Sequence, residues 1–250
     1  QELLDELNAF NPDCVALTVL SDESAIAARI TALVKAWKAD VPVIWGGKFP
    51  TLEPEKTLLD DNADFACRGE GLEAFPEFLD ALEHKKDLYS IRNIWAKRDT
   101  YIIKNPIRPL LKDLDSLPYL DWDIFTKKGH FYKPFNGQAL VGGDHMTNWG
   151  CPYACTYCIN HVLHELYDNK DRVRRYGVDR IVDEMSFLAK KYGLEFFRFY
   201  DEDFLMRPTS VLREFSEKYK ERVDLPCVIE TNPHTVTEEK AILLKNMNCV

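Results

Sequence analysis

Short apolar runs alternate with segments of helical periodicity before about residue 90. The runs at 15–20, 41–45 and 65–68 have the length and continuity of buried strands. Apolar residues recur at helical spacing in 24–37 and 75–82. Strands that alternate with helices predict a parallel sheet with helices on both faces, and ligands bind such sheets beyond the carboxyl ends of the strands.

A second alternation begins at about residue 138. Strands are predicted at 139–147, 196–200 and 227–230, and a helix is predicted after each of them. Thr235 and Glu238 have the spacing of a capping box before the last helix. This order predicts the opening of a (β/α) barrel, in which charged residues at the carboxyl ends of strands are active-site candidates.

The segment between the two alternations has few periodic features. It holds a predicted β-hairpin around 97–100 and then a stretch interrupted by prolines. We therefore predict a first domain at 1–89, a connector at 90–137 and a second domain at 138–250. We expect the connector's aromatic side chains to pack between the domains rather than to bind substrate: Trp122, Phe125, Phe131, Tyr132 and Phe135.

Composition narrows the class of protein. The chain has 250 residues, of which 46% are hydrophobic and 29% are charged, as in ordinary globular domains. The net charge of -9 argues against a nucleic-acid partner. No apolar run approaches the roughly 18 residues that cross a membrane, and no signal peptide is visible. The seven cysteines, an odd number, favour a reducing compartment, so we expect a cytoplasmic protein.

Both ends of the sequence suggest an excerpt of a longer protein. The chain opens directly on the helical pattern of Leu3, Leu4, Leu7 and Phe10. It stops at 249–250, where a further strand would begin. We therefore expect the first domain to lack its N-terminal strand and the second to lack its C-terminal part.

Three cysteines share one short segment with the spacing C-x3-C-x2-C: Cys151, Cys155 and Cys158. Three thiolates can hold three irons of a 4Fe-4S cluster and leave the fourth iron open to another ligand. One alternative is a zinc site completed by His161 or His164. Another is the packing of three buried thiols on one helix face, which Pro152 disfavours because the residue before proline avoids the helical region.

The segment Gly-Cys-Pro-Tyr-x-Cys-x-Tyr-Cys at 150–158 resembles the signature of the cobalamin-dependent branch of the radical S-adenosylmethionine (SAM) enzymes. The resemblance implies that the three cysteines hold the cluster, that SAM chelates the open iron, and that Tyr157 lies near the adenine. Asp-Glu-Asp-Phe at 201–204 resembles the family's acidic element near the SAM amino group. It implies SAM binding by Asp201 and Glu202, although adjacent carboxylates also serve as a solvated loop and helix cap.

The patterns Trp-Gly-Gly-Lys-Phe-Pro-Thr at 45–51 and Cys-Arg-Gly-Glu-Gly at 67–71 resemble the cobalamin-binding domain of many radical SAM enzymes. Thr-Val-Leu at 18–20 stands where such domains carry Ser-x-Leu. Glycine after a strand often only turns the chain, but without Cβ it also lets a flat ligand approach the backbone. The resemblance implies these cobalamin contacts: Thr18, Leu20, Gly46, Gly47, Gly69, Glu70 and Gly71.

These observations predict an α/β chain in two parts. The first is a partial Rossmann-like (flavodoxin-like) cobalamin-binding domain, and the second holds the first βα units of a partial TIM-type (β/α) radical SAM barrel. The resemblance implies an enzyme whose 4Fe-4S cluster reductively cleaves SAM and which, with cobalamin, methylates an unactivated carbon of a small-molecule substrate. An electron donor such as flavodoxin or ferredoxin is the implied partner.

Two other functions remain open at this point. Oxidative cyclisation or rearrangement would use the same cofactors. A cobalamin sensor with a structural zinc site belongs to a different class of protein.

Overall fold

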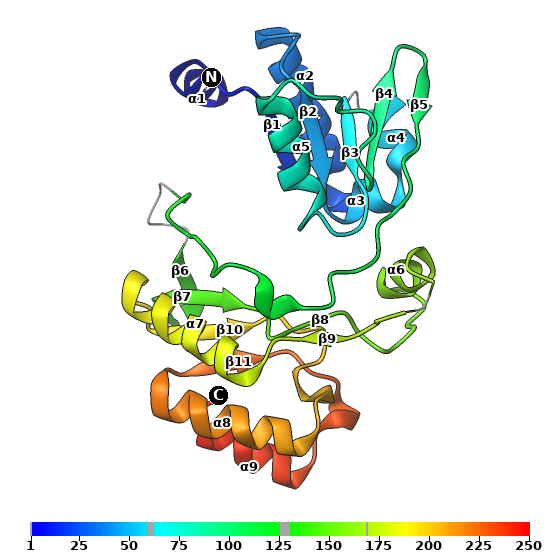
Figure 1. The fold of residues 1–250 in the computed structure, drawn as a ribbon. Helices are drawn as coiled ribbons and strands as arrows, with labels where there is room; N and C mark the ends of the chain where they lie inside the picture. Colours follow the sequence, from blue (N-terminus) through cyan, green and yellow to red (C-terminus); the bar gives the residue numbers. More distant parts are fainter. Residues whose placement is uncertain (1, 60–62, 126–130, 169) are drawn as a thin grey trace. The chain divides into compact units, whose positions relative to one another are not determined.

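The computed structural model describes four stretches of the chain: residues 2–59, 63–125, 131–168 and 170–250. The chain divides into two compact units, shown in Figure 1. The first unit comprises Gln1–Leu111 and Cys155–Lys170, and the second comprises Lys112–Ala154 and Asp171–Val250. The segment that follows Ala154 therefore packs with the N-terminal part of the chain.

The first unit is built on a five-stranded sheet in the order β1-β2-β3-β4-β5. Its strands are β1 (Val15–Thr18), β2 (Val43–Gly46), β3 (Phe65–Cys67), β4 (Ile94–Arg98) and β5 (Tyr101–Ile103). The first three are parallel, as predicted, whereas β4 and β5 pair antiparallel. The hairpin that was expected in the connector therefore extends the sheet of the first unit.

Helices cover both faces of this sheet. They are α1 (Glu2–Phe10), α2 (Ser24–Trp37), α3 (Lys48–Leu52), α4 (Pro54–Leu59) and α5 (Ala74–Glu83). The first unit also contains α6 (Asn160–Leu166). Successive strand residues point to opposite faces, so Trp45 packs with Val34 of α2 while Ile44 packs with Phe78 of α5. Burying a side chain such as that of Ile44 or Phe78 stabilises the fold by about 1.5–3 kcal/mol. The predicted parallel sheet with helices on both faces is confirmed.

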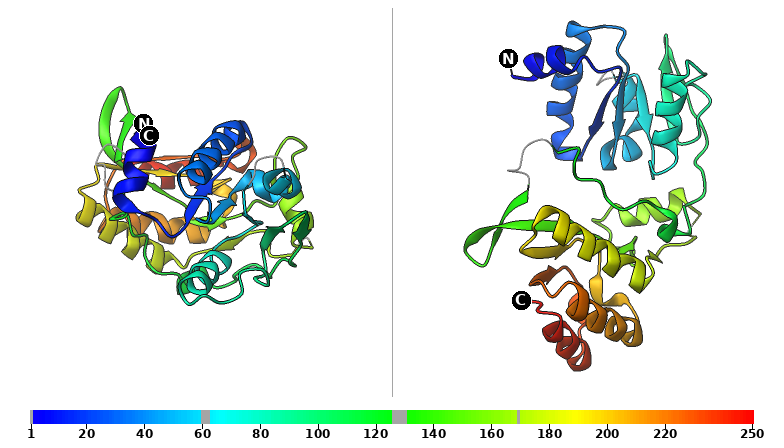
Figure 2. Two further views of the ribbon diagram at one scale, coloured as in Figure 1. Left: turned by 90° about the horizontal axis from the view of Figure 1, so that it is seen from above. Right: turned by 60° about the vertical axis from the view of Figure 1, so that its left-hand side comes forward.

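The second unit is built on a four-stranded sheet in the order β11-β10-β7-β6. Its strands are β6 (Tyr132–Phe135), β7 (Gln138–His145), β10 (Phe196–Phe199) and β11 (Cys227–Ile229). The last three are parallel, and β6 forms an antiparallel hairpin with β7, drawn in green in Figure 2. The sequence did not predict β6, which contains Pro134, a residue that sheets tolerate at an edge strand.

Three helices pack on one face of the second sheet: α7 (Val178–Tyr192), α8 (Thr209–Arg222) and α9 (Glu238–Asn246). Their buried side chains, among them Met185, Phe215 and Leu243, share one core with Phe197 and Phe199 of β10. Consecutive parallel strands with helices on one side are the arrangement expected for the opening of a barrel. In the described part of the chain, no helix combines the length and the hydrophobicity needed to cross a membrane.

The start of α9 differs from the prediction. Thr237, not Thr235, is the N-cap, and its hydroxyl accepts a hydrogen bond of 3.3 Å from the backbone N–H of Lys240. The hydroxyl of Thr235 instead contacts the carboxylate of Asp203 at 3.0 Å. The predicted capping box is wrong because that threonine serves the end of a neighbouring strand.

Aromatic residues of the connector pack within the second unit. Trp122 and Phe131 lie 5.2 and 5.6 Å, between ring centroids, from Tyr192 of α7. Phe135 lies 4.4 Å from Phe196 of β10 by the same measure. These rings pack against α7 and β10 of the second unit.

Candidate active site

The carboxyl ends of β1 and β2 bring together four residues predicted to contact cobalamin. Thr18 is the register partner of Gly46, and Leu20 is exposed just beyond the strand. The turn after β2 lies close against β1, because a Cβ on Gly47 would be 3.0 Å from the carbonyl oxygen of Val19. Gly47 also has φ +97°, a conformation that L side chains rarely adopt.

A threonine hydroxyl joins this turn to the loop after β3. Thr51 of α3, which is 4% exposed, donates a hydrogen bond of 2.8 Å to the carbonyl oxygen of Gly47. The same hydroxyl accepts one of 3.0 Å from the backbone N–H of Gly69. Sequence reasoning missed Thr51, although a threonine one turn into a helix is a known source of such bonds to the backbone.

The open positions on this edge fit a flat ligand. A Cβ on Gly46 would meet nothing nearer than 4.0 Å, and one on Gly71 would make only ordinary contacts, the nearest at 3.6 Å. Gly69, Glu70 and Gly71, in the loop after β3, are each partly exposed, although a Cβ on Gly69 would lie 2.1 Å from the hydroxyl oxygen of Tyr167. A macrocycle such as a corrin could approach this backbone, so the residues suit cobalamin.

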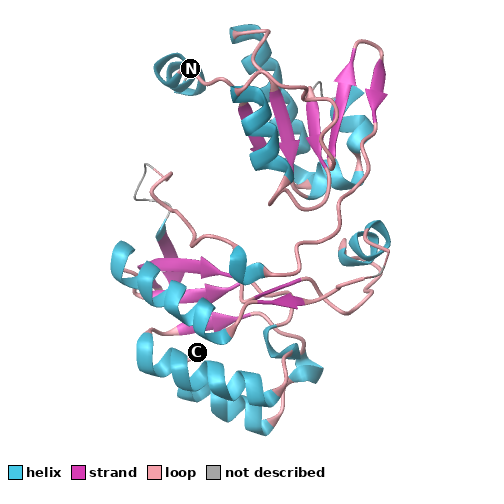
Figure 3. Ribbon diagram, viewed as in Figure 1, coloured by secondary structure: helices cyan, strands magenta, loops and turns pink. Residues whose placement is uncertain are grey.

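The three motif cysteines lie on an irregular loop between β8 (Asn148–Trp149) and α6, drawn as loop in Figure 3. Cys151 is buried in the second unit, whereas Cys155 and Cys158 are partly exposed in the first. Residues 151–158 contain no helix. The alternative of three thiols on one helix face is therefore wrong.

Gly150 shapes the start of the cysteine loop. Its φ is +87°, and a Cβ there would lie 2.1 Å from the carbonyl oxygen of Arg172. That close approach belongs to the short pairing of β8 with β9 (Arg174–Arg175). Only glycine allows the chain to enter the loop at Cys151 in this way.

The donor chemistry of the loop fits an iron-sulfur cluster. All three thiols are free of disulfide bonds. The side-chain amide of Asn160 donates a hydrogen bond of 3.4 Å to the sulfur of Cys158, a contact of the type that tunes cluster potentials. Nδ1 of His161 contacts the carbonyl oxygen of Cys158. Among the described residues, no group of three or more His, Cys, Asp or Glu side chains lies close enough together to hold a metal ion.

Asp201, two residues after the end of β10, is fully buried. Its Oδ1 accepts hydrogen bonds from the backbone N–H and hydroxyl of Thr147, at 3.1 and 2.7 Å, and from the backbone N–H of Asn148 at 2.8 Å. Nη2 of Arg207 lies 3.5 Å from the same oxygen. Burial raises the pKa of Asp201, and Arg207 opposes the rise in part. Asp201 thus fastens the end of β10 to the loop after β7.

Asp203 makes the equivalent connection on the other side. It is also fully buried, and its Oδ1 accepts hydrogen bonds from the hydroxyls of Thr231 and Thr235 at 2.5 and 3.0 Å. The backbone N–H of Asn232, after β11, donates a third at 3.3 Å. Glu202, between the two aspartates, is exposed. Two of the three acids, Asp201 and Asp203, are therefore buried carboxylates that connect neighbouring loops, and the carboxylate of Glu202 faces solvent.

Two family models match the chain. Residues 1–79 match the B12 binding domain, and residues 149–250 match the Radical SAM superfamily. The chain joins a B12 binding domain to a radical SAM domain. This pairing confirms both parts of the predicted fold class and favours the cluster over the zinc alternative.

Known proteins resemble both domains together. An uncharacterized methyltransferase of Pyrococcus horikoshii is 26% identical over 244 residues, which cover 97% of this chain and 51% of that protein. The anaerobic magnesium-protoporphyrin IX monomethyl ester cyclase of Rubrivivax gelatinosus is 24% identical over 227 residues, 89% of this chain and 38% of that protein. The chain thus spans about half the length of the first relative and less of the second.

The fold also matches a solved enzyme. TsrM of Kitasatospora setae, a radical SAM methyltransferase solved with tryptophan and a SAM analog, superposes with a TM-score of 0.73 at 18% identity. The match covers 99% of this chain and 49% of TsrM. TsrM has also been solved with cobalamin and a [4Fe-4S] cluster bound. At this level of identity the likeness shows a common fold.

Proposed function

We propose that this protein is a cobalamin-dependent radical SAM enzyme that methylates an unactivated carbon of a small molecule. One observation carries the proposal: the chain places a C-x3-C-x2-C loop beyond the first parallel strand of its radical SAM domain and joins that domain to a B12 binding domain. The methyltransferase of Pyrococcus horikoshii and TsrM support the reaction class.

We assign the cluster to the thiolates of Cys151, Cys155 and Cys158. When bound, the cluster supplies the electron for reductive cleavage of SAM, and cobalamin carries the methyl group. The protein contributes binding and the exclusion of side reactions. The side chain of Tyr157 is 92% exposed, which leaves its ring available to lie against the adenine.

The acidic residues after β10 receive different roles in this proposal. Glu202 faces solvent, so its carboxylate is available to the cationic amino group of SAM. Asp201 was also predicted to bind SAM, but the loop after β7 occupies its Oδ1. We therefore propose that Asp201 supports SAM binding by positioning Thr147 and Asn148.

The first unit would hold cobalamin along the ends of its parallel strands. Gly46 and Gly71 offer open backbone, whereas the Tyr167 hydroxyl fills the position of a Cβ on Gly69. Gly69 and Glu70 would therefore contact the ligand only through their partly exposed remaining surface. Thr18 and Leu20 are exposed beside it, where a hydroxyl and an apolar side chain can contact the ligand's tail. The electron would come from a reduced carrier such as flavodoxin or ferredoxin. We also propose a cytoplasmic location, because the odd number of cysteines favours a reducing compartment.

A second reaction on the same cofactors is supported by one relative. The Rubrivivax gelatinosus protein is a cyclase, and it matches 89% of this chain at 24% identity. Oxidative cyclisation would consume SAM without placing its methyl group on the product. SAM labelled in that methyl group therefore separates the two reactions, because only methylation transfers the label.

Metal analysis and SAM cleavage test the cluster assignment. The full-length protein, reconstituted anaerobically, should bind about four iron atoms per chain and form deoxyadenosine and methionine when reduced with SAM. Cys151→Ala, Cys155→Ala and Cys158→Ala should each abolish this cleavage, whereas the matched control Cys14→Ala should not. About one zinc per chain with no iron after reconstitution would overturn the proposal and favour the zinc-containing sensor.

The cobalamin assignment has an independent test. Titration of the full-length protein with cobalamin should change the visible spectrum of the cofactor and saturate at about one equivalent. A spectrum unchanged from free cobalamin would remove this half of the proposal and leave the cluster assignment intact.

A further inference from the structure

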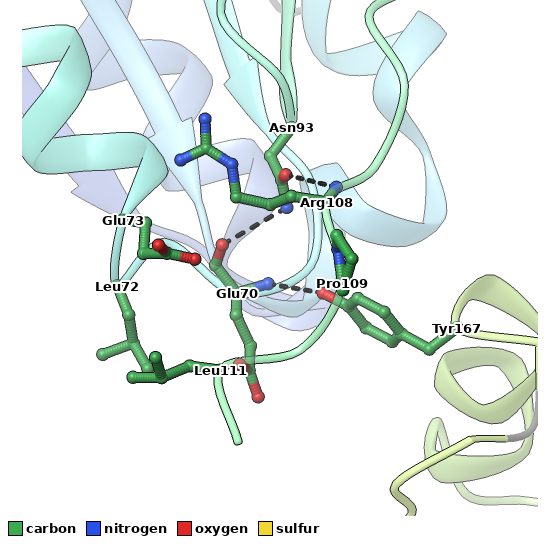
Figure 4. A pocket seen from close by; sticks show the side chains of 8 residues that line it. All are labelled: Glu70, Leu72, Glu73, Asn93, Arg108, Pro109, Leu111 and Tyr167. Atoms are coloured by element: carbon green, nitrogen blue, oxygen red, sulfur yellow. Dashed lines mark hydrogen bonds between the residues drawn. The ribbon is translucent and has the colours of Figure 1, made fainter. Parts of the chain in front are cut away.

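Tyr167 connects the segment of the motif cysteines to the predicted cobalamin loop. It stands directly after α6, which begins two residues beyond Cys158. Its hydroxyl oxygen accepts a hydrogen bond of 2.8 Å from the backbone N–H of Glu70, 97 residues earlier in the chain. Figure 4 shows the Tyr167 ring reaching from the α6 segment to that backbone. All of these residues belong to the first unit.

Gly69 is shaped to receive this tyrosine. Its φ is +69°, and a Cβ there would lie 2.1 Å from the hydroxyl oxygen of Tyr167 and 3.0 Å from the ring carbon that bears it. Any other residue would push the ring away and also strain the backbone. The glycine and the tyrosine hydroxyl therefore form one complementary contact.

The rest of the loop is fixed by other elements of the first unit. The side-chain amide of Asn93 donates hydrogen bonds to the carbonyl oxygens of Arg68 and Glu70, at 2.9 and 3.3 Å. The hydroxyl of Thr51 accepts from the N–H of Gly69. The pocket beside Tyr167 encloses about 10 Å³, room for about one water molecule. The contact is thus a packed joint rather than a ligand cavity.

We propose that Tyr167 is a positioning residue that fixes Cys155 and Cys158 relative to the Gly69–Gly71 loop. The inference rests on the proposed function, in which these two segments hold the cluster and cobalamin. A short helix is a rigid spacer of about 1.5 Å per residue, so anchoring the end of α6 constrains the cysteine loop at its start. Without the joint, each cofactor keeps its own contacts, but their separation is no longer fixed.

The joint itself is tested on the protein without cofactors. Tyr167→Phe should speed hydrogen exchange of the Glu70 amide, and Gly69→Ala should lower the melting temperature. Because Tyr167→Phe removes the atom that a Cβ would strike, the double variant should melt higher than Gly69→Ala alone. Tyr101→Phe, at a tyrosine that is 52% exposed on β5, is the matched control and should change neither quantity. Strict additivity with an unchanged Glu70 amide would overturn the inference.

The positioning role is tested by electron paramagnetic resonance of the full-length protein loaded with both cofactors. Dipolar broadening between cob(II)alamin and the reduced cluster reports their separation. We expect Tyr167→Phe to keep the wild-type iron and cobalamin content but to change this broadening. Unchanged broadening in that variant would overturn the inference. A wild-type sample that lacks either signal would instead refute the proposed function, and the inference with it.

Discussion

The carboxyl edges of the two sheets are held together by different chemistry. In the first unit, a neutral hydroxyl of Thr51 bonds to the backbone of Gly47 and Gly69, at turns where a side chain would not fit. In the second unit, the buried carboxylates of Asp201 and Asp203 collect hydrogen bonds from the loops on either side. The packing of the first edge depends on glycines, which have no side chain. The packing of the second edge depends on two carboxylates that are buried away from water.

This difference suits the ligands that we propose. A large flat cofactor needs backbone that it can approach closely, and glycine allows this because it has no side chain. A small charged ligand needs polar groups held in fixed places, and buried carboxylates fix them strongly because leaving one unpaired is costly. Substitutions should therefore act by different mechanisms on the two edges.

The largest effect is expected from Asp201→Ala. It would leave Arg207 buried without its ion-pair partner and would remove the acceptor used by Thr147 and Asn148. We expect a loss of about 3–5 kcal/mol in the free energy of unfolding, measured by urea denaturation. Its neighbour Glu202→Ala is the control and should cost less than about 0.5 kcal/mol. Equal losses would mean that the two acids do not differ in role.

On the glycine edge, Gly47→Ala should cost about 1–3 kcal/mol. The new Cβ would lie 3.0 Å from the carbonyl oxygen of Val19, and alanine would be forced to φ +97°. Gly71→Ala is the matched control, because its Cβ meets nothing closer than 3.6 Å. Thermal unfolding checks both variants. A Gly71→Ala variant that loses as much as Gly47→Ala would contradict the account of this edge.

These glycines show what the sequence could predict. The strands β1, β2 and β3 are continuous apolar runs ended by turn residues, and the structure confirms all three. The turns after these strands could be predicted from their glycines, because few other residues adopt the backbone conformations of such turns. The two types of domain, and with them the classes of cofactor, were likewise predicted and are confirmed by the family matches.

Other features depend on contacts that no local pattern records. Asp201 and Glu202 are adjacent and chemically alike, yet the first is buried and the second exposed. Asp201 accepts hydrogen bonds from Thr147 and Asn148, more than 50 positions earlier in the chain. Tyr167 contacts Glu70 across 97 positions of sequence. Pro134 concealed β6, because proline within a run argues against a strand. The roles of individual residues toward SAM and cobalamin stay predictions.

A smaller effect, which should depend on pH, is expected at Glu184 in the second unit. Glu184 of α7 is 2% exposed and accepts hydrogen bonds from Arg180 at 2.7 Å and from the backbone N–H of Leu120 at 2.6 Å. Burial alone would raise its pKa, but His145, Leu120 and Arg180 together lower it below the ordinary 4.5. The carboxylate therefore stabilises the fold above that value, and this contribution is lost as the pH falls through the folded-state pKa.

Glu184→Gln should accordingly cost about 1–2 kcal/mol at neutral pH and almost nothing in acid. The measurement is the difference in unfolding free energy from wild type across the acid range. Thr51→Val, which removes a neutral tie of the first unit, is the comparison and should cost a similar amount at every pH. A pH-independent difference for Glu184→Gln would contradict the assignment of a charged tie.

The smallest effect on stability belongs to Glu202→Gln, which should change the free energy of unfolding by less than about 0.5 kcal/mol. If Glu202 pairs with the SAM amino group, the same variant should weaken SAM binding about tenfold, equivalent to about 1.4 kcal/mol. Titration of SAM into the reconstituted protein measures this. Unchanged affinity would remove Glu202 from the SAM site while leaving the buried ties in place.

In the proposed function, one protein holds both cobalamin and a SAM-binding cluster. The decisive measurement is electron paramagnetic resonance of the full-length protein, reconstituted anaerobically with iron, sulfide and cobalamin and then reduced. We predict a cob(II)alamin signal and a reduced 4Fe-4S signal in the same sample, with the cluster signal changed by SAM. A sample that lacks one or both of these signals would contradict the proposed function. So would a cluster signal that SAM leaves unchanged.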